Sequence, residues 1–82
     1  MTYRFIEDSG HGWLEVPVAE LHALGIARDI SPYSYRRGEL AYLEEDCDMS
    51  MFFGAKRARG EPVPYVTVYQ DVSPIRGYAR WH

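Results

Sequence analysis

The polar and apolar positions at the start of the chain alternate in the way typical of a β-strand. Between residues 2 and 7, Tyr3 and Phe5 alternate with the other side chains, and most of these residue types favour strands. Residues 8–12 then supply an Asp and two glycines, which is the composition of a turn. We therefore predict a strand over residues 2–7, a turn over 8–12, and an extended segment over 13–16 that extends or caps the sheet.

The pattern then changes to helical spacing and back to alternation. Pro17 sits where a helix can begin, apolar residues follow at spacings of three and four, and a glycine follows the last turn. This predicts a short helix of about two turns. Residues 30–43 alternate again around Gly38, so they predict a β-hairpin with Tyr33 and Tyr35 on one face of its first strand.

A second helix is predicted between Asp46 and Gly60. Asp46 is the N-cap candidate, and acidic and basic residues near the two ends complement the helix dipole. Residues 49–55 are apolar on nearly every side, so the helix is either buried between layers or offers apolar side chains to a partner. Residues 65–69 alternate and predict a strand, and the tail to His82 is predicted to be a loop with a short extended piece.

Together these elements predict one α+β domain over residues 1–82, with an antiparallel sheet of about four to five strands packed against two helices. Repeats, low-complexity tracts and a linker that could divide two domains are all missing from the sequence. A chain of 82 residues is near the lower end of what one hydrophobic core can hold together. It therefore has little room for a deep active-site cleft.

Composition and charge narrow the possible functions. The formal net charge is −3, whereas a protein that binds phosphate backbones usually carries a basic surplus. Aromatic residues make up 15% of the chain, and such rings both pack small cores and mark binding surfaces. Cys47 is the only cysteine, which fits a reducing compartment. The sequence shows neither a signal peptide nor a bilayer-length apolar stretch, so we expect a cytoplasmic protein without a membrane contact.

Residues that could act as catalysts or metal ligands are few and scattered. None of the histidines lies with Cys47 at the spacing of a zinc site. Cys47 could pair with a histidine as nucleophile and base, but acidic neighbours raise a thiol pKa, and a half-buried packing cysteine is the favoured interpretation. We therefore expect no enzyme, no catalytic residue, no metal and no cofactor. The histidines considered are His11, His22 and His82.

An acidic run is the sharpest feature of the sequence. Five carboxylates between Glu39 and Asp48 follow one another without a Lys or Arg. One interpretation is a solvated strand end followed by helix-cap charges. The other is a negative patch that docks on a basic, nucleic-acid-binding surface of another protein, where complementary charge speeds encounter and fixes register. The partner contacts expected on this second interpretation are Glu44, Glu45, Asp46 and Asp48.

A second cluster combines tyrosine and arginine side chains. Tyr33, Tyr35, Arg36 and Arg37 have the composition of protein-interface hot spots and also of platforms that stack single-stranded nucleic acid. The basic residues of segment 56–59 are grouped with them. The two tyrosines and two arginines of segment 33–37 are the second-rank candidates for partner binding. Because no helix-turn-helix, RRM or KH signature accompanies them, a partner protein is favoured over direct nucleic-acid binding.

Four segments form a pattern that spans nearly the whole chain: Gly10-His11-Gly12-Trp13-Leu14, Ile30-Ser31-x-Tyr33-Ser34-Tyr35, Tyr42-Leu43-Glu44-Glu45-Asp46-Cys47-Asp48, and Ser73-Pro74-Ile75-Arg76-x-Tyr78. In this pattern the chain resembles a group of small, mostly uncharacterised proteins carried by bacteriophages, prophages and plasmids. The resemblance implies a mobile-element context. Small acidic phage proteins without enzymatic machinery often counter host defence, and anti-CRISPR proteins are a prominent class of them. The resemblance brings no catalytic residue with it.

The leading hypothesis is a non-enzymatic protein of mobile-element origin that works in the host bacterial cytoplasm. Its partner would be a host protein or nucleoprotein complex, such as a CRISPR effector, which it inhibits. Three alternatives remain open. They are a nucleic-acid-binding regulator that uses the Tyr and Arg surfaces, a small enzyme built around Cys47 or a histidine, and a homo-oligomer whose interface is the apolar helix face at residues 49–53.

Overall fold

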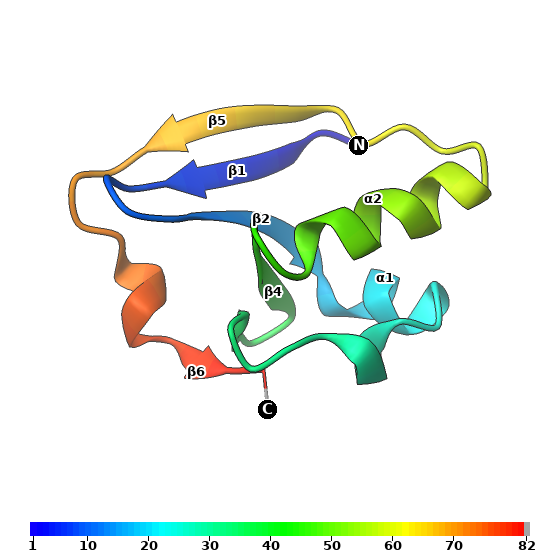
Figure 1. The fold of residues 1–82 in the computed structure, drawn as a ribbon, viewed down its shortest axis with the longest axis horizontal. Helices are drawn as coiled ribbons and strands as arrows, with labels where there is room; N and C mark the ends of the chain where they lie inside the picture. The colour runs from blue at the N-terminus through cyan, green and yellow to red at the C-terminus, as the bar shows by residue number, and fades with distance from the viewer. Residues whose placement is uncertain (82) are drawn as a thin grey trace.

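The structure is a computed structural model that describes residues 1–81, and it confirms the predicted α+β class (Figure 1). One mixed sheet of six strands packs with two α-helices and two short 3₁₀ helices. In chain order the elements are β1 (Tyr3–Glu7), β2 (Gly12–Pro17), α1 (Val18–Ala23), the 3₁₀ helix η1 (Ala27–Asp29), β3 (Tyr35–Arg37), β4 (Leu40–Glu44), α2 (Met49–Ala58), β5 (Tyr65–Tyr69), the 3₁₀ helix η2 (Pro74–Gly77) and β6 (Ala79–Arg80).

The sheet has the strand order β5-β1-β2-β4-β3-β6, and it corrects the prediction of four to five antiparallel strands. Its sixth strand comes from the C-terminal tail, where β6 pairs with β3. The pair β1–β5 is parallel, while the other four pairs are antiparallel. The parallel pair arises because α2 carries the chain back across the sheet between β4 and β5, as a helical crossover does. Alternation within residues 65–69 predicts a strand but is silent about its direction.

Glycines fix two of the predicted turns in the way that backbone sterics require. Gly38 has a φ of +59° between β3 and β4, where the hairpin was predicted to turn. Gly12, at the start of β2, faces the ring of Phe5 so closely that a Cβ would lie 2.2 Å from its Cζ atom. The turn over residues 8–12 therefore joins β1 and β2 as predicted, and its last residue has to lack a side chain.

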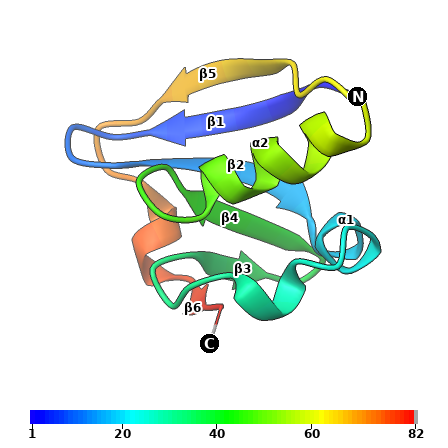
Figure 2. The ribbon, with the colours of Figure 1, turned by 45° about the vertical axis from the view of Figure 1, so that its right-hand side comes forward.

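The helices cover one face of the sheet, which holds the larger part of the core (Figures 1 and 2). Phe5, Leu14 and Leu43 lie side by side in neighbouring strands and are all buried there. Phe52 of α2 is fully buried, and its ring meets the Tyr3 ring edge-on at 5.6 Å between centroids. The apolar helix segment thus packs against the sheet through Met49 and Phe52, so most of this face is used within the single chain.

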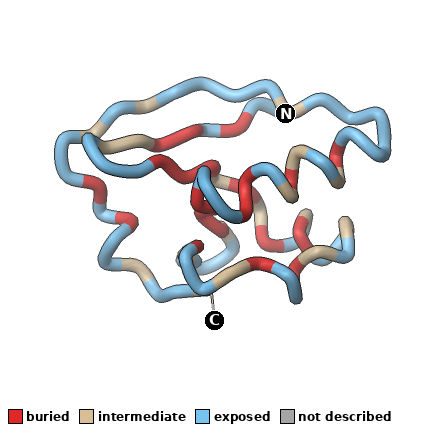
Figure 3. Tube along the Cα trace, viewed as in Figure 1, coloured by how far each residue is buried: buried red, intermediate tan, exposed pale blue. Residues whose placement is uncertain are grey.

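The opposite face of the sheet is covered by the C-terminal segment. Ile75 of η2 is 1% exposed and packs with Ile6, Trp13 and Tyr42, which project from three strands. Burial is accordingly concentrated in the central strands, whereas the chain along β5 is mostly exposed (Figure 3). The tail is therefore an ordered layer that holds η2 and β6. No helix within residues 1–81 is both long and apolar enough to cross a membrane.

Helix α2 begins two residues later than the sequence predicted. Its N-cap residue is Asp48 rather than Asp46, and no side chain makes a capping hydrogen bond there. The carboxylate of Asp48 is instead used by another part of the chain, as described below. His82, one of the histidines considered as ligands, lies outside the described residues.

Candidate functional site: an aromatic and acidic hollow

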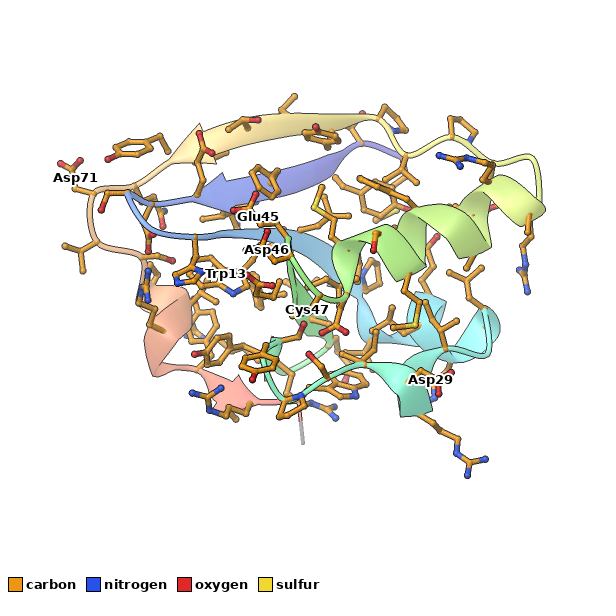
Figure 4. The ribbon with its side chains drawn as sticks, in the orientation of Figure 1. Trp13, Asp29, Glu45, Asp46, Cys47 and Asp71 are labelled. Carbon is orange, nitrogen blue, oxygen red and sulfur yellow. The ribbon has the colours of Figure 1, made fainter. Side chains whose placement is uncertain are left out.

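The predicted site segments meet at one hollow of about 430 Å³ on the sheet face that carries the C-terminal layer. Each of the four segments that form the sequence pattern contributes to it, although they are spread along the chain. Figure 4 shows Trp13, Asp46 and Cys47 close to one another in the middle of the molecule. The hollow is lined by His11, Trp13, Tyr33, Tyr35, Glu44, Asp46, Cys47, Arg76 and Arg80.

Trp13 anchors this hollow. It is 2% exposed, and the centroid of its ring lies 6.2 Å from that of Tyr35 and 6.0 Å from that of His11. The guanidinium of Arg76 lies 5.4 Å from the Trp13 centroid, and that of Arg80 lies 5.3 Å from the Tyr35 centroid, which are cation–π distances. The indole N–H of Trp13 has no hydrogen-bond partner among residues 1–81. Rings and guanidinium groups thus build a rigid wall, and sequence reasoning passed over Trp13 because it looked like an ordinary strand residue.

Asp8 holds the turn that places His11 beside the hollow. One carboxylate oxygen accepts hydrogen bonds from the backbone N–H groups of Gly10 and His11, both at 2.8 Å. The other accepts from Arg76 Nε at 3.0 Å, which joins the turn to η2. The Arg76 guanidinium and the two N–H groups hold the pKa of Asp8 well below its usual range. Asp8 is therefore a positioning residue that the sequence analysis treated only as part of a turn.

The contacts of the Asp8 carboxylate should make the stability of the protein depend on pH in the acid range. Because the folded-state pKa of Asp8 is lowered, its contribution is complete above the ordinary aspartate pKa of about 3.9 and is lost as the pH falls below it. We expect Asp8→Asn to lower the urea midpoint near neutral pH and to leave a flatter decline below about pH 4. The matched control is Asp71→Asn, since Asp71 is exposed (Figure 4). Parallel profiles for Asp8→Asn and wild type would contradict this role.

The acidic run does not form one continuous exposed patch, which corrects the sequence prediction in part. Glu44 is 6% exposed, accepts a hydrogen bond from the backbone N–H of Asp46 at 2.8 Å, and lies 3.5 Å from His11 Nδ1. Glu45 and Asp46 are exposed, and their carboxylates make no hydrogen bond or ion pair within the described part of the chain. Partial burial and the neighbouring charges of Asp46, Glu44 and Glu7 raise the pKa of Glu45. We call Glu7, Glu44, Glu45 and Asp46 the acidic rim.

Asp48 turns inward, so the structure does not offer it as a surface contact. It is 2% exposed. Its carboxylate accepts hydrogen bonds from the backbone N–H of Ser31 at 3.0 Å, from the Ser31 hydroxyl at 2.6 Å, and from the Ser34 hydroxyl. These bonds tie the loop that carries Tyr33 to the start of α2. Asp48 thus contributes to the hollow indirectly, because it fixes the conformation of the loop whose Tyr33 side chain lines it.

The tyrosine and arginine cluster is divided between the hollow and the neighbouring surface. Tyr33 lies in the loop before β3 and is 62% exposed, which corrects its predicted place on the strand, yet it still lines the hollow together with Tyr35. Arg36 lies over the Trp81 ring at 5.0 Å, and Arg37 donates a hydrogen bond to the Tyr78 hydroxyl at 3.1 Å. The basic segment 56–59 lies at the C-terminal end of α2 and does not line the hollow.

The fold also brings together possible metal ligands that are far apart in the sequence. One ligand atom each from His11, Glu44 and Asp46 lies within 4.8 Å of the others. Imidazole nitrogen and carboxylate oxygen are suitable ligands for a divalent ion such as Zn²⁺. His11 is therefore exposed, as expected, but it is not isolated from other possible ligands, and its position depends on the Asp8 turn. The spacing of 33 to 35 residues gave no signal for this grouping.

Cys47 is exposed, which corrects the prediction of a half-buried packing residue. It lines the hollow together with His11, but no hydrogen bond joins the two side chains among the described residues. Desolvation raises the pKa of the thiol, and Glu44, Asp48 and Asp46 raise it further, as the acidic sequence had predicted. A raised pKa keeps the thiol protonated at neutral pH, and this weighs against a thiolate nucleophile.

Comparison of the chain with protein-family models, with curated proteins and with solved structures gave no match. The interpretation of the hollow therefore rests on its own geometry: an aromatic wall, the exposed carboxylate of Asp46 in its lining with that of Glu45 on the next residue, and an Arg76 side chain that is paired with Asp8.

Proposed function

We propose that this protein is a non-enzymatic protein of mobile-element origin that binds and inhibits a host nucleic-acid-handling defence complex, as anti-CRISPR proteins do. The contact would be made by the acidic rim and the hollow beside it, which would receive an Arg or Lys side chain from the partner. Surfaces that bind nucleic acid are rich in such side chains. A protein that covers them would compete with the nucleic acid.

One observation carries this proposal: the exposed carboxylates of Glu45 and Asp46 lack an ion-pair partner within residues 1–81, and Asp46 lines the aromatic hollow. An incoming cation would meet unpaired negative charge together with the faces and edges of Tyr33 and Tyr35, which is the combination that favours guanidinium and ammonium groups. Complementary charge would also speed the encounter and fix its orientation.

The positive groups of the hollow cancel only part of this charge. Arg76 is paired with Asp8 at 3.0 Å. Arg80 donates a hydrogen bond to the backbone oxygen of Pro32 at 2.9 Å and lies over the Tyr35 ring. Arg80 keeps its positive charge, but the carboxylates of the acidic rim outnumber it, so this surface presents net negative charge to a partner.

The test is a comparison of two charge-reversed double variants. Tagged wild type, Glu45→Lys/Asp46→Lys and the control Asp29→Lys/Asp71→Lys are used as baits in lysate of a defence-competent bacterium, and co-eluting proteins are identified by mass spectrometry. Both double variants change the net charge equally, and all four acids are exposed. For the partner recovered, we expect the first variant to weaken binding at least about tenfold, and the control to bind like wild type.

Equal weakening by both variants would attribute the effect to net charge and would contradict a contact at the acidic rim. Unchanged binding by a folded Glu45→Lys/Asp46→Lys variant would do the same. Recovery of nucleic acid without a protein partner would instead support the regulator that uses the Tyr and Arg surfaces. A gel shift with short DNA or RNA that weakens with added salt would confirm that alternative.

A further inference from the structure

Strand β5 forms an open edge of the sheet that lacks the usual protection of edge strands. It lies outermost beside β1, and its sequence, Tyr-Val-Thr-Val-Tyr, contains no charge and no proline. Tyr65, Val66 and Tyr69 are 47%, 53% and 57% exposed. Natural edge strands are usually short, charged or covered, because an open edge pairs readily with another strand. The opposite edge, β6, is two residues long and contains Arg80.

The hydrogen bonds to β1 determine which backbone groups of β5 remain free. Tyr3 N–H donates to Pro64 O, and Gln70 N–H donates to Glu7 O, both at 2.9 Å. In a parallel ladder the bonding residues of a strand alternate, so the even positions 64–70 face β1. The N–H and C=O groups of Tyr65, Thr67 and Tyr69 therefore point away from the sheet. These three residues offer a second strand a complete set of donors and acceptors.

The sequence of β5 is a palindrome centred on Thr67, which is one of these outward-bonding residues. A second copy of the same strand, placed antiparallel around a two-fold axis at Thr67, pairs Thr67 with Thr67, Tyr65 with Tyr69, and Val66 with Val68. The outward groups of Tyr65, Thr67 and Tyr69 then coincide with the hydrogen-bonded pairs of an antiparallel ladder. Aromatic pairs and Thr–Thr pairs are among the cross-strand pairs that stabilise sheets.

We propose that β5 is a self-association surface through which two copies of this chain form a symmetric dimer with one continuous sheet. The occupant of the edge is a second copy because the palindrome makes the strand complementary to itself, as a two-fold interface requires. The flanks agree with this register. Asp71 would lie opposite Val63, and Glu61 would lie opposite Ser73, so no like charges face each other. The inference does not depend on the proposed function.

The surface beside β5 also fits a second copy. An apolar hollow lies there, lined by Phe53, Arg57, Tyr65 and residues 60–63. The Phe53 and Tyr65 rings stack at 6.3 Å between centroids. Tyr69 of the second copy, directly opposite Tyr65 and on the same face of the sheet, would extend this stack. The dimer thus gives a packing partner to a tyrosine that is more than half exposed in the single chain.

The test combines molecular mass with cross-linking at defined positions. We expect sedimentation equilibrium to give a mass that rises from 9.5 kDa toward twice that value as the concentration increases. Thr67→Lys should keep the protein monomeric, because it places two like charges opposite each other at the axis. Ser50→Lys, on the exposed side of α2, is the matched control and should associate like wild type. A wild type that stays monomeric at every concentration would overturn the proposal, as would a folded Thr67→Lys variant that still dimerises.

Cross-linking tests the register itself. In a Cys47→Ser background, Thr67→Cys should form a disulfide-linked dimer on oxidation, because two hydrogen-bonded partners in an antiparallel pair have Cα atoms about 5.5 Å apart. Tyr69→Cys should cross-link far more slowly, since the two copies of residue 69 are about 13 Å apart along the strands. Equal cross-linking at both positions, or faster cross-linking at residue 69, would reject the palindromic register.

Discussion

Replacing Asp48 by alanine is expected to destabilise the protein by about 3–5 kcal/mol, because it leaves several buried donors without an acceptor. The Asp48 carboxylate accepts hydrogen bonds from Ser31 N–H and from the hydroxyls of Ser31 and Ser34. Ser34 is fully buried and its oxygen also accepts from Glu44 N–H at 3.0 Å, so water cannot easily replace the carboxylate. The loss should appear as a lower urea midpoint with little change in the slope.

The control for this prediction is Asp29→Ala, which removes an exposed carboxylate from η1 and should change stability by less than about 0.5 kcal/mol. Asp48→Asn keeps one acceptor oxygen, and we expect it to fall between wild type and Asp48→Ala. Asp48→Ala should also weaken partner binding under conditions in which the variant is still folded, because the hydrogen bonds to Asp48 hold the Tyr33 loop. A loss below about 1 kcal/mol would show that Asp48 does not hold this loop.

The alternation and spacing of the chain predicted the elements well, because they depend on neighbouring residues. The strand at 65–69, the hairpin turn at Gly38 and the apolar helix between Asp46 and Gly60 are all present, although the helix begins only at Met49. The direction of β5 and the pairing of β6 were not predictable in this way. Both depend on where the chain returns after α2 and η2, and hence on contacts between residues far apart in the sequence.

The candidate site was predicted in its composition but not in its geometry. Glu45 and Asp46 are exposed, as the predicted acidic surface requires. Glu44 and Asp48 are buried instead, because Glu44 lies beside His11 and Asp48 accepts hydrogen bonds from the serines of the 31–34 loop. Nothing local distinguishes these two kinds of carboxylate. A buried carboxylate needs partners, and partners that lie many residues away leave no periodic signal.

These contacts also explain part of the four-segment pattern in structural terms. Asp48 joins the second segment to the third through Ser31 and Ser34, and Arg76 of the fourth lies over Trp13 of the first. Much of the pattern therefore specifies how the hollow is built. Tyr33, Glu45 and Asp46 are exposed members of the pattern, and these are the ones to which we assign the contact with a partner.

Replacing Lys56 by methionine is expected to destabilise the protein by about 1–3 kcal/mol, because it removes the buried partner from a partly buried ion pair. Lys56 is 6% exposed, and its ammonium donates to the carboxylates of Glu20 and Glu61, the latter at 2.8 Å. Glu20 also accepts from the Tyr3 hydroxyl at 2.8 Å. Hydrogen bonds to Glu20 and Glu61 raise the pKa of Lys56, so its contribution is complete below the ordinary lysine pKa of about 10.4 and is lost in stronger alkali.

The matched control is Arg28→Met, because Arg28 in η1 is exposed and should be replaceable within about 0.5 kcal/mol. The double variant Lys56→Met/Glu20→Gln separates the two origins of the loss. A neutral glutamine can still accept from Tyr3, so the double variant should recover much of the stability that Lys56→Met loses. If the double variant recovers no stability, the loss in Lys56→Met would come from lost packing of the lysine stem. The network at residues 3, 20 and 56 would then not fix α2 to α1 and the sheet electrostatically.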